Sequence, residues 1–443
     1  ICKFSLLYDD CFPLLPIFEK KKKCKFKQPW MSKGLLISVR KKQKLHQQFL
    51  KQRNDNNRTK YTIYKNKLTS LLRTAKKQYY YKMFAKYKHD CKKTWSQVNV
   101  LLGKSKKNDL PCNMYFENIS YNNRKEIVEC FNSYFVNVGS NLARGIPVVD
   151  TSFNDYLKTH NDFTLFLKPT TVFEIIELSK TLKPYKASGP DGISPRVVKE
   201  CIHFIVDPLC NIFNKSISSG VFPDSLKLAK IIPIYKKNEK ENIQNYRPIA
   251  LLSIFSKLFE KILQKRIYDF LVKNNLLINE QFGFRKTYST CLGALHLTDY
   301  VIKNMDKGNY SLGVFMDLSK AFDTIDHHIL LNKLNYYGIR GLPLKLIENY
   351  LSDRKQYVVV DGVCSTKRDV ICGVPQGSVL GPLLFLIYIN DIKQSSNVLN
   401  FTLFADDTSV ITSHSSVFTL VDIMNNELIK LDNWFKRNKL FLN

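Results

Sequence analysis

Two adjacent carboxylates, Asp406 and Asp407, stand between two runs of apolar, aromatic and β-branched residues in the segment Phe401–Ile411. This pattern predicts a strand, a tight turn that carries both acids, and a second strand. Like charges held side by side repel each other, and a divalent cation offsets that repulsion, since carboxylate oxygens suit a hard ion such as Mg²⁺. A lone acid pair of this kind is more often a solvated turn, so its function depends on the rest of the chain.

A third acid, Asp317, follows the apolar stretch Tyr310–Met316, which we expect to be a buried strand. A carboxylate at the carboxyl end of a strand is where sheets commonly present catalytic ligands, and a helix cap is the alternative interpretation. His327 and His328 are adjacent and therefore point to different faces, so we assign them no metal.

The segments from Tyr310 onward predict an alternation of strands and helices. In order, they are the strand 310–316, a helix capped by Asp326 and ended by Gly338, a hairpin over 356–370, a loop over 373–378, a helix over 379–389, the carboxylate hairpin and a last helix. This order predicts an antiparallel sheet backed by helices on one face, which is an α+β domain.

The charge of the chain points to a polyanionic partner. The 443 residues carry a net charge of +30, and 44% of them are apolar, which is enough to fill real cores. Residues 1–110 hold 29 Lys and Arg against 6 Asp and Glu, so most of the excess lies there. The eleven cysteines form no metal-ligand spacing and indicate reduced thiols, hence an intracellular protein of the nucleus or cytoplasm. No apolar run is long enough for a bilayer, so we expect no membrane partner.

The basic N-terminal quarter is helical in character from about Ser32 to Leu102. Its apolar and tyrosine positions recur at three- and four-residue steps, with Lys and Arg on the other faces. Such a face suits a nucleic-acid backbone, and a helical hairpin with a solvated face explains it equally well. The lysine cluster 20–27 allows a nuclear localisation signal, a phosphate-binding patch or a plain solvated run.

Several motifs in one order resemble the reverse transcriptase of non-LTR, LINE-type, jockey-like retrotransposons. They are Asn245-Tyr246-Arg247-Pro248-Ile249, Gln281-Phe282-Gly283-Phe284-Arg285 with Ser289-Thr290, Met316-Asp317-Leu318-Ser319-Lys320-Ala321-Phe322-Asp323, Gly373-Val374-Pro375-Gln376-Gly377-Ser378-Val379-Leu380-Gly381-Pro382, and Phe404-Ala405-Asp406-Asp407. Pro29-Trp30-Met31 and the basic helices after it resemble the connector that follows the endonuclease in such elements.

The resemblance implies a right-hand polymerase, an RNA-directed DNA polymerase that extends a DNA primer along an RNA template with dNTPs. It implies a basic helical, nucleic-acid-binding extension over 1–110, a helical N-terminal extension over 111–180, fingers over 181–305 and a palm over 306–443, with the reverse transcriptase domain at roughly 215–443. We expect the chain to be a fragment whose thumb is missing or incomplete. No upstream endonuclease or RNase H segment is recognised in it.

The resemblance also implies the chemistry of the acids. Asp317 and Asp406, with Asp407 beside them, would hold two Mg²⁺ ions, or Mn²⁺ as a substitute, for attack of the primer 3′-hydroxyl on the α-phosphate. Of these acids, Asp406 is the surer ligand. A lysine that helps to protonate the leaving group is expected just beyond Asn443.

Further roles come from the resemblance residue by residue. Arg247 would bind the incoming triphosphate through its guanidinium fork, with Arg285 as a weaker candidate. Gln376 would pack near the nucleotide sugar and base, and Phe322 would be the steric gate that excludes a 2′-hydroxyl. Ordinary packing is the alternative for each of these side chains. Lys186, in a basic glycine-containing loop, and Lys286 are the candidate nucleic-acid contacts.

Three other interpretations remain at this stage. An RNA-dependent RNA polymerase shares the palm, but Phe322 and Ala405 argue against it, because RNA synthesis needs a polar partner for the 2′-hydroxyl. A group II intron-type maturase would differ in a C-terminal RNA-binding domain. A decayed, catalytically inactive, nucleic-acid-binding remnant of an element is the competitor from another class.

Overall fold

The structure is a computed structural model that describes residues 2–12, 28–102, 110–147, 152–157 and 161–443. The chain divides into two compact units. One unit contains Ile1–Cys11 together with Leu110–Asn443, and the other contains Phe12–Asp109. We describe each unit by itself. The lysine cluster 20–27 lies outside the described residues.

The smaller unit is helical, as the sequence predicts for 32–102. It consists of α2 (Lys33–Lys51), α3 (Asp55–Lys86) and α4 (Cys91–Leu101). The side chains of Ser32, Asn54 and Asp90 cap these helices. Helices α2 and α3 pack as a hairpin, in which the Phe49 and Tyr61 rings are stacked 6.4 Å apart. Few of their side chains are buried, so the unit has a largely solvated basic surface.

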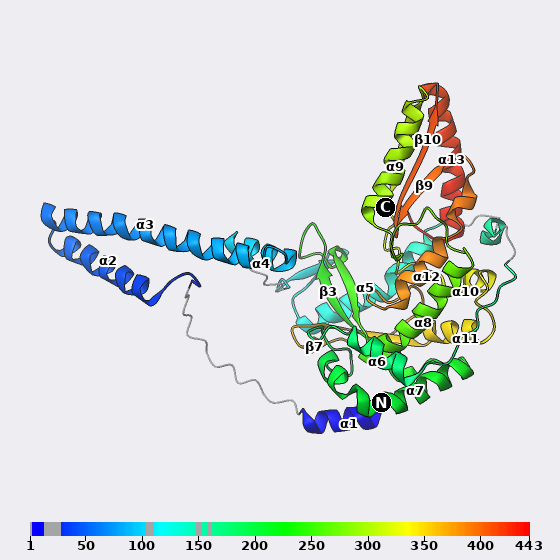
Figure 1. The fold of residues 1–443 in the computed structure, drawn as a ribbon, viewed down its shortest axis with the longest axis horizontal. Helices are drawn as coiled ribbons and strands as arrows, with labels where there is room; N and C mark the ends of the chain where they lie inside the picture. The colour runs from blue at the N-terminus through cyan, green and yellow to red at the C-terminus, as the bar shows by residue number, and fades with distance from the viewer. Residues whose placement is uncertain (1, 13–27, 103–109, 148–151, 158–160) are drawn as a thin grey trace. The chain divides into compact units, whose positions relative to one another are not determined.

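The larger unit has a helical core around which two sheets are arranged (Figure 1). Its helices are α1 (Cys2–Cys11), α5 (Arg124–Arg144), α6 (Val172–Lys180), α7 (Pro195–Ser219), α8 (Ile254–Lys273), α9 (Thr290–Met305), α10 (His327–Tyr336), α11 (Leu342–Leu351), α12 (Leu380–Ile389) and α13 (Val417–Arg437). Short 3₁₀ turns lie at Phe153–Tyr156, Asp224–Leu226, Ile243–Asn245 and Ile392–Ser395. Nearly every side chain of α12 is buried, so this helix forms the centre of the core.

The first sheet carries the acids. It is antiparallel in the order β5 (Tyr310–Met316), β10 (Asp407–His414), β9 (Asn400–Phe404). Helices α9 and α13 flank this sheet on either side (Figure 1). The predicted antiparallel sheet is therefore present, but its helices lie on both faces rather than on one.

The prediction that 310–316 is a buried strand was wrong. Strand β5 is an edge strand, and Phe315 exposes 73% of its surface. An edge strand pairs on one side only, and apolar side chains do not by themselves reveal that. The strand does end at Met316, so Asp317 stands at its carboxyl end as predicted.

The second sheet is mixed. It follows the order β4 (Tyr246–Leu251), β3 (Leu228–Tyr235), β6 (Arg354–Val360), with β7 (Val363–Cys364) and β8 (Arg368–Val370) both pairing with β6. Strands β3 and β6 are parallel, so the predicted hairpin 356–370 joins this sheet instead of the sheet that carries the acids. A small hairpin of β1 (Met114–Phe116) and β2 (Ile119–Tyr121) interrupts the predicted helical extension 111–180.

The described part of the chain contains no helix that is both long enough and apolar enough to span a lipid bilayer.

Candidate active site

The carboxylate hairpin forms with a turn one residue earlier than predicted. Asp407 lies opposite Phe404 in the β9–β10 pair, so Ala405 and Asp406 make the turn and Asp407 is the first residue of β10. Ala405 adopts a left-handed backbone conformation with φ of +57°. This turn leaves Asp406 half-buried, whereas the Asp407 side chain is exposed.

Gln281 holds this turn in place, a role that the sequence reasoning missed. Its side chain is 3% exposed, and Oε1 accepts hydrogen bonds from the backbone N–H groups of Ala405 (2.9 Å) and Gly283 (2.7 Å). The backbone beside it pairs with β9, since Phe282 donates to Leu403. A Cβ on Gly283 would lie 2.3 Å from the Ala405 nitrogen, so only glycine permits this approach.

We expect Gln281→Leu to lower the free energy of unfolding by about 1–3 kcal/mol, because two buried N–H groups lose their acceptor. Urea denaturation followed by circular dichroism measures this loss. Gln394→Leu is the matched control, since Gln394 is exposed, and it should change stability by less than about 0.5 kcal/mol. Equal stability of the two variants would contradict this role of Gln281.

The charge on Asp406 is affected by the other two acids. Burial is the largest cause that raises the pKa of Asp406, and the negative charges of Asp407 and Asp317 raise that pKa further. Asp317 acts on Asp406 although 88 residues separate them in the chain. Pairing of Thr408 with Met316 explains this, since it places the two strand ends side by side. The fold thus gathers three acids at one end of the sheet.

Asp317 is held by the last described residues of the chain. The Asn443 side-chain amide donates to Asp317 Oδ2 at 3.0 Å, and the Asn443 backbone N–H donates to the Asp317 carbonyl at 2.9 Å. Leu318 and Leu442 form an antiparallel bridge beside them. These contacts fix the backbone of Asp317 relative to the sheet.

One cation acts on the acids from the second sheet. Arg247, exposed on β4, lowers the pKa of Asp406 by its positive charge. Burial is the largest cause that lowers the pKa of Lys320, and the positive charges of Lys236 and Arg247 lower that pKa further, while Asp323 raises it. The site therefore places a cluster of positive charges beside a cluster of negative charges.

The donor set suits a divalent cation in its chemistry. Carboxylate oxygens are the preferred ligands of hard cations, and the repulsion that raises the pKa of Asp406 is what such a cation relieves. Within the described ranges, no group of three or more His, Cys, Asp or Glu side chains is arranged to hold a metal ion as it stands. Asp317, Asp406 and Asp407, which the fold brings to one end of the sheet, are the side chains that could hold such a cation.

Phe322 lies in an aromatic cluster with Phe284 and Phe385. Its ring is 4.9 Å from the ring of Phe385 on α12 and 6.3 Å from the ring of Phe284. Phe385 is fully buried and Phe284 is 55% exposed, so Phe322 lies at the border of the core. Its predicted role as a steric gate stays a prediction.

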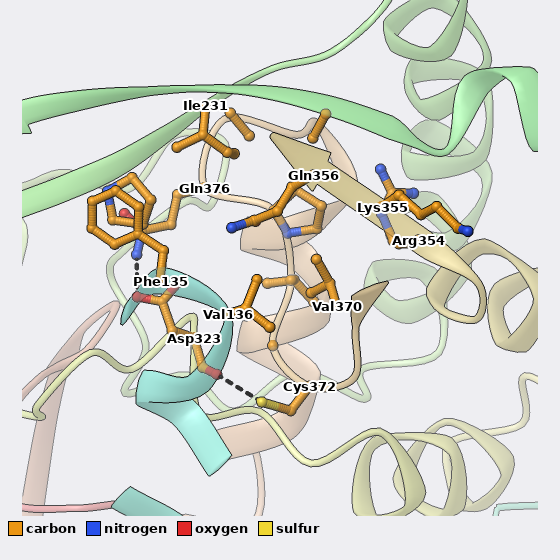
Figure 2. Close-up of a pocket in the computed structure, with 16 residues that line it drawn as sticks. Phe135, Val136, Ile231, Asp323, Arg354, Lys355, Gln356, Val370, Cys372 and Gln376 are labelled. Carbon is orange, nitrogen blue, oxygen red and sulfur yellow. Dashed lines mark hydrogen bonds between the residues drawn. The ribbon is translucent and has the colours of Figure 1, made fainter. Parts of the chain in front are cut away.

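Gln376 is held by a fourth acid, Asp323, to which the sequence analysis assigns no role. Gln376 Nε2 donates to Asp323 Oδ2 at 2.7 Å, and both side chains lie on the wall of a cavity of about 40 Å³. Figure 2 shows the two side chains pointing toward each other. The Gly373–Ser378 loop, which contains Gln376, reaches β4, where the Ala250 N–H donates to the Gln376 carbonyl at 2.7 Å.

A buried carboxylate supports the helix after this loop. Glu260 on α8 is fully buried, and its Oε2 accepts from the N–H groups of Val379 (2.6 Å) and Leu380 (3.3 Å) at the start of α12. A negative charge is favoured at a helix N-terminus. Burial nevertheless raises the pKa of Glu260, while Arg354 opposes that shift. This contact fixes the loop with Gln376 against the helical core.

The contacts of the remaining predicted residues are with groups other than the acids. Arg285 Nη1 donates to the Ile278 carbonyl at 2.6 Å, and its guanidinium lies 4.2 Å from the centroid of the Tyr288 ring. Arg285 lines a separate cavity with residues of the α8 end, and none of the three acids lines it. These contacts involve none of the three acids, and the predicted dNTP contact of Arg285 stays a prediction.

Lys286 and Lys186 are both exposed. Lys286 Nζ lies 5.3 Å from the centroid of the Tyr268 ring, and it lines an open cavity together with Lys261 and Lys265. The charge of Lys186 lowers the pKa of Lys257, after burial, which is the larger cause. Both lysines thus belong to a basic surface.

Comparison with known proteins gives the class of this fold and site. Residues 234–443 match the family model described as reverse transcriptase (RNA-dependent DNA polymerase). These residues include strands β4 to β10 and all three acids. Residues 234–443, just under half of the chain, are therefore similar to a reverse transcriptase domain, and their mixed helices and sheets agree with the predicted α+β class.

The relatives that this chain matches are proteins of transposons and other mobile elements. The chain is 32% identical over 297 residues to the probable RNA-directed DNA polymerase from transposon BS of Drosophila melanogaster, covering 64% of this chain and 32% of that protein. It is 30% identical over 286 residues to the RNA-directed DNA polymerase from mobile element jockey of Drosophila funebris, covering 63% and 31%. The chain thus spans about a third of the length of these relatives, and the predicted resemblance is confirmed.

Proposed function

We propose that this chain is the RNA-directed DNA polymerase part of a non-LTR retrotransposon protein, which adds dNTPs to a primer 3′-hydroxyl along an RNA template. The observation that carries the proposal is the convergence of Asp317 on Asp406 within a reverse transcriptase domain. In this proposal residues 181–305 are the fingers and 306–443 are the palm.

Asp317 and Asp406, with Asp407 beside them, would hold the divalent cations. Bound Mg²⁺, or Mn²⁺ in its place, supplies activation of the 3′-hydroxyl and charge neutralisation at the leaving pyrophosphate. Arg247 binds the triphosphate, because its exposed guanidinium lies where its charge reaches Asp406 and matches phosphate oxygens. Opposite charges on the two sheets thus orient the nucleotide.

The basic surfaces bind the nucleic acid in this proposal. Lys286 and Lys186 contact template phosphates, and helices α2, α3 and α4 add a basic face with tyrosines for further backbone contact. These contacts are sequence-independent, so they supply affinity rather than target choice.

Primer extension by the full chain tests the proposal. With an RNA template, a DNA primer, dNTPs and Mg²⁺, we expect extension that stops when the cation is chelated or the template is omitted. Salt-sensitive binding of the duplex without any cation-dependent extension would favour the decayed, nucleic-acid-binding remnant instead. Extension with NTPs in preference to dNTPs would favour an RNA-dependent RNA polymerase.

We expect Phe322→Val to reduce the preference for dCTP over CTP by about 10–100-fold, because a smaller side chain leaves room for a 2′-hydroxyl. The ratio of kcat/KM values for the two nucleotides measures this preference. Phe418→Val is the matched control, since Phe418 is 87% exposed on α13. If the ratio is unchanged in Phe322→Val, Phe322 is only a packing residue.

A further inference from the structure

Asp323 and Gln376 join two segments whose backbones contact each other. Asp323 belongs to the segment after β5, and Gln376 to the loop before α12. Gly373 adopts φ of +77°, and a Cβ there would lie 2.8 Å from the Asp323 Cα. The Val374 N–H donates to the Phe322 carbonyl at 2.9 Å, and Cys372 Sγ donates to the Asp323 carbonyl at 3.4 Å. Both backbones are therefore held in contact beside Phe322.

The backbone on the far side of Gln376 is equally constrained. Gly377 adopts φ of +118°, and a Cβ there would lie 2.6 Å from the Ala250 carbonyl oxygen. With its backbone held, Gln376 can move only by its side-chain torsions, and a bond to its amide limits all of them. The Asp323 carboxylate contacts that amide through Nε2.

We propose that Asp323 is a positioning residue for polymerisation, which fixes the Gln376 amide so that its carbonyl oxygen faces the incoming nucleotide. The inference rests on the proposed function and adds a residue to it. An ionised carboxylate only accepts hydrogen bonds, so Asp323 must receive the Gln376 NH₂ group. Gln376 then presents Oε1 away from Asp323 as an acceptor. An asparagine in place of Asp323 both donates and accepts, so it would no longer fix which end of the Gln376 amide faces it.

The protonation state of Asp323 is what makes the inference testable. Burial raises the pKa of Asp323 to about 6, while Lys320 and the bond from Gln376 oppose the shift. Above that pH the carboxylate only accepts, and below it the protonated group donates to Oε1 and releases the fixed orientation. The affinity for dNTP should therefore fall as the pH drops through about 6.

Other charged and titratable groups lie around Asp323. Those beside it or on the same cavity wall are Lys320, Tyr134, Cys372, Arg354 and Lys355, and His327 bonds to the Gly373 carbonyl. Burial raises the pKa of Tyr134 to about 12 and raises the pKa of the Cys372 thiol, so both stay neutral near pH 6. Burial lowers the pKa of His327 below its usual 6.5, so a His327→Gln variant must be included.

The experiment measures dCTP affinity and KM for the full chain on an RNA template with a DNA primer, between pH 5 and 8. We expect the wild type to lose about tenfold in affinity from pH 7.5 to pH 5, the size of one hydrogen bond. Asp323→Asn should show the weak affinity at every pH. Asp326→Asn, the same change three residues on at a helix cap, and His327→Gln should keep the wild-type profile.

A double-variant cycle separates positioning from a structural role. In a Gln376→Met background the amide is gone, so adding Asp323→Asn should change neither affinity nor its pH profile. A purely structural Asp323 would lower affinity in that background too, and this result overturns the inference. A wild-type profile in Asp323→Asn overturns it as well, and leaves the proposed function standing. A wild type that neither binds dCTP nor extends the primer overturns the proposed function, and this inference with it.

Discussion

Asp406→Asn is expected to lower the rate of primer extension by about a thousandfold or more, since it removes a charged ligand from the cation site. Asn keeps the size of the side chain and one oxygen, so the turn should keep its shape. The loss comes from charge, because Asp406, Asp317 and Asp407 together provide the negative field at this sheet end. Steady-state extension with dNTPs on an RNA template measures it.

The matched control for that experiment is Asp422→Asn. Asp422 is exposed on α13, beyond the acid turn in the chain, and we expect its replacement to leave the extension rate within about twofold. Equal rates for Asp406→Asn and the wild type would end the assignment of Asp406 as a catalytic residue. Equal loss in both variants would show that the effect is not specific to the turn.

Lys333→Met is expected to lower the free energy of unfolding by about 3–5 kcal/mol, because it leaves the Asp391 carboxylate buried without a counter-charge. Lys333 Nζ lies 2.6 Å from Asp391 Oδ1, and the two side chains are 0% and 2% exposed. Lys333 also donates to the Tyr388 carbonyl on α12 at 2.6 Å. Urea denaturation of the full chain measures the loss.

An exposed ion pair of equal length is the control for Lys333. Lys303 Nζ also lies 2.6 Å from its partner Asp299, but these side chains are 68% and 55% exposed. Lys303→Met should therefore change stability by less than about 1 kcal/mol. The double variant Lys333→Met with Asp391→Leu should recover much of the loss, since neither charge remains buried. Similar costs for Lys333→Met and Lys303→Met would contradict this account of the core.

The sequence was sufficient wherever a short segment determines its own structure. Asp326 accepts from the Ile329 N–H and starts α10 as predicted, and the acid hairpin forms between β9 and β10. The placement of Asp317 at a strand end follows from the apolar run before it. Local pattern also predicted the α+β class, since the order of elements limits how they can pack.

The rest depends on pairing between distant segments, which local pattern does not contain. The parallel contact of β3 with β6 joins residues more than a hundred positions apart, so the second sheet was not foreseen. Gln281 and Asp323 each belong to a recognisable motif, but the motif does not predict their contacts. Gln281 accepts from the Ala405 N–H, and Asp323 accepts from the Gln376 amide. One signal in the sequence could have indicated these contacts. Both polar side chains stand beside apolar residues, and a polar side chain that is buried with such neighbours needs a hydrogen-bond partner.

The most direct test of the central claim is cation binding at equilibrium, because it asks whether Asp317 and Asp406 share a site without requiring polymerisation. Titration of the full chain with Mn²⁺, followed by electron paramagnetic resonance, would be done for the wild type, Asp317→Asn, Asp406→Asn and the double variant. We predict that each single variant weakens Mn²⁺ binding by at least about tenfold and that the double variant is little worse than either. Full Mn²⁺ affinity in Asp317→Asn, or additive losses in the double variant, would show that the two acids do not hold a common cation.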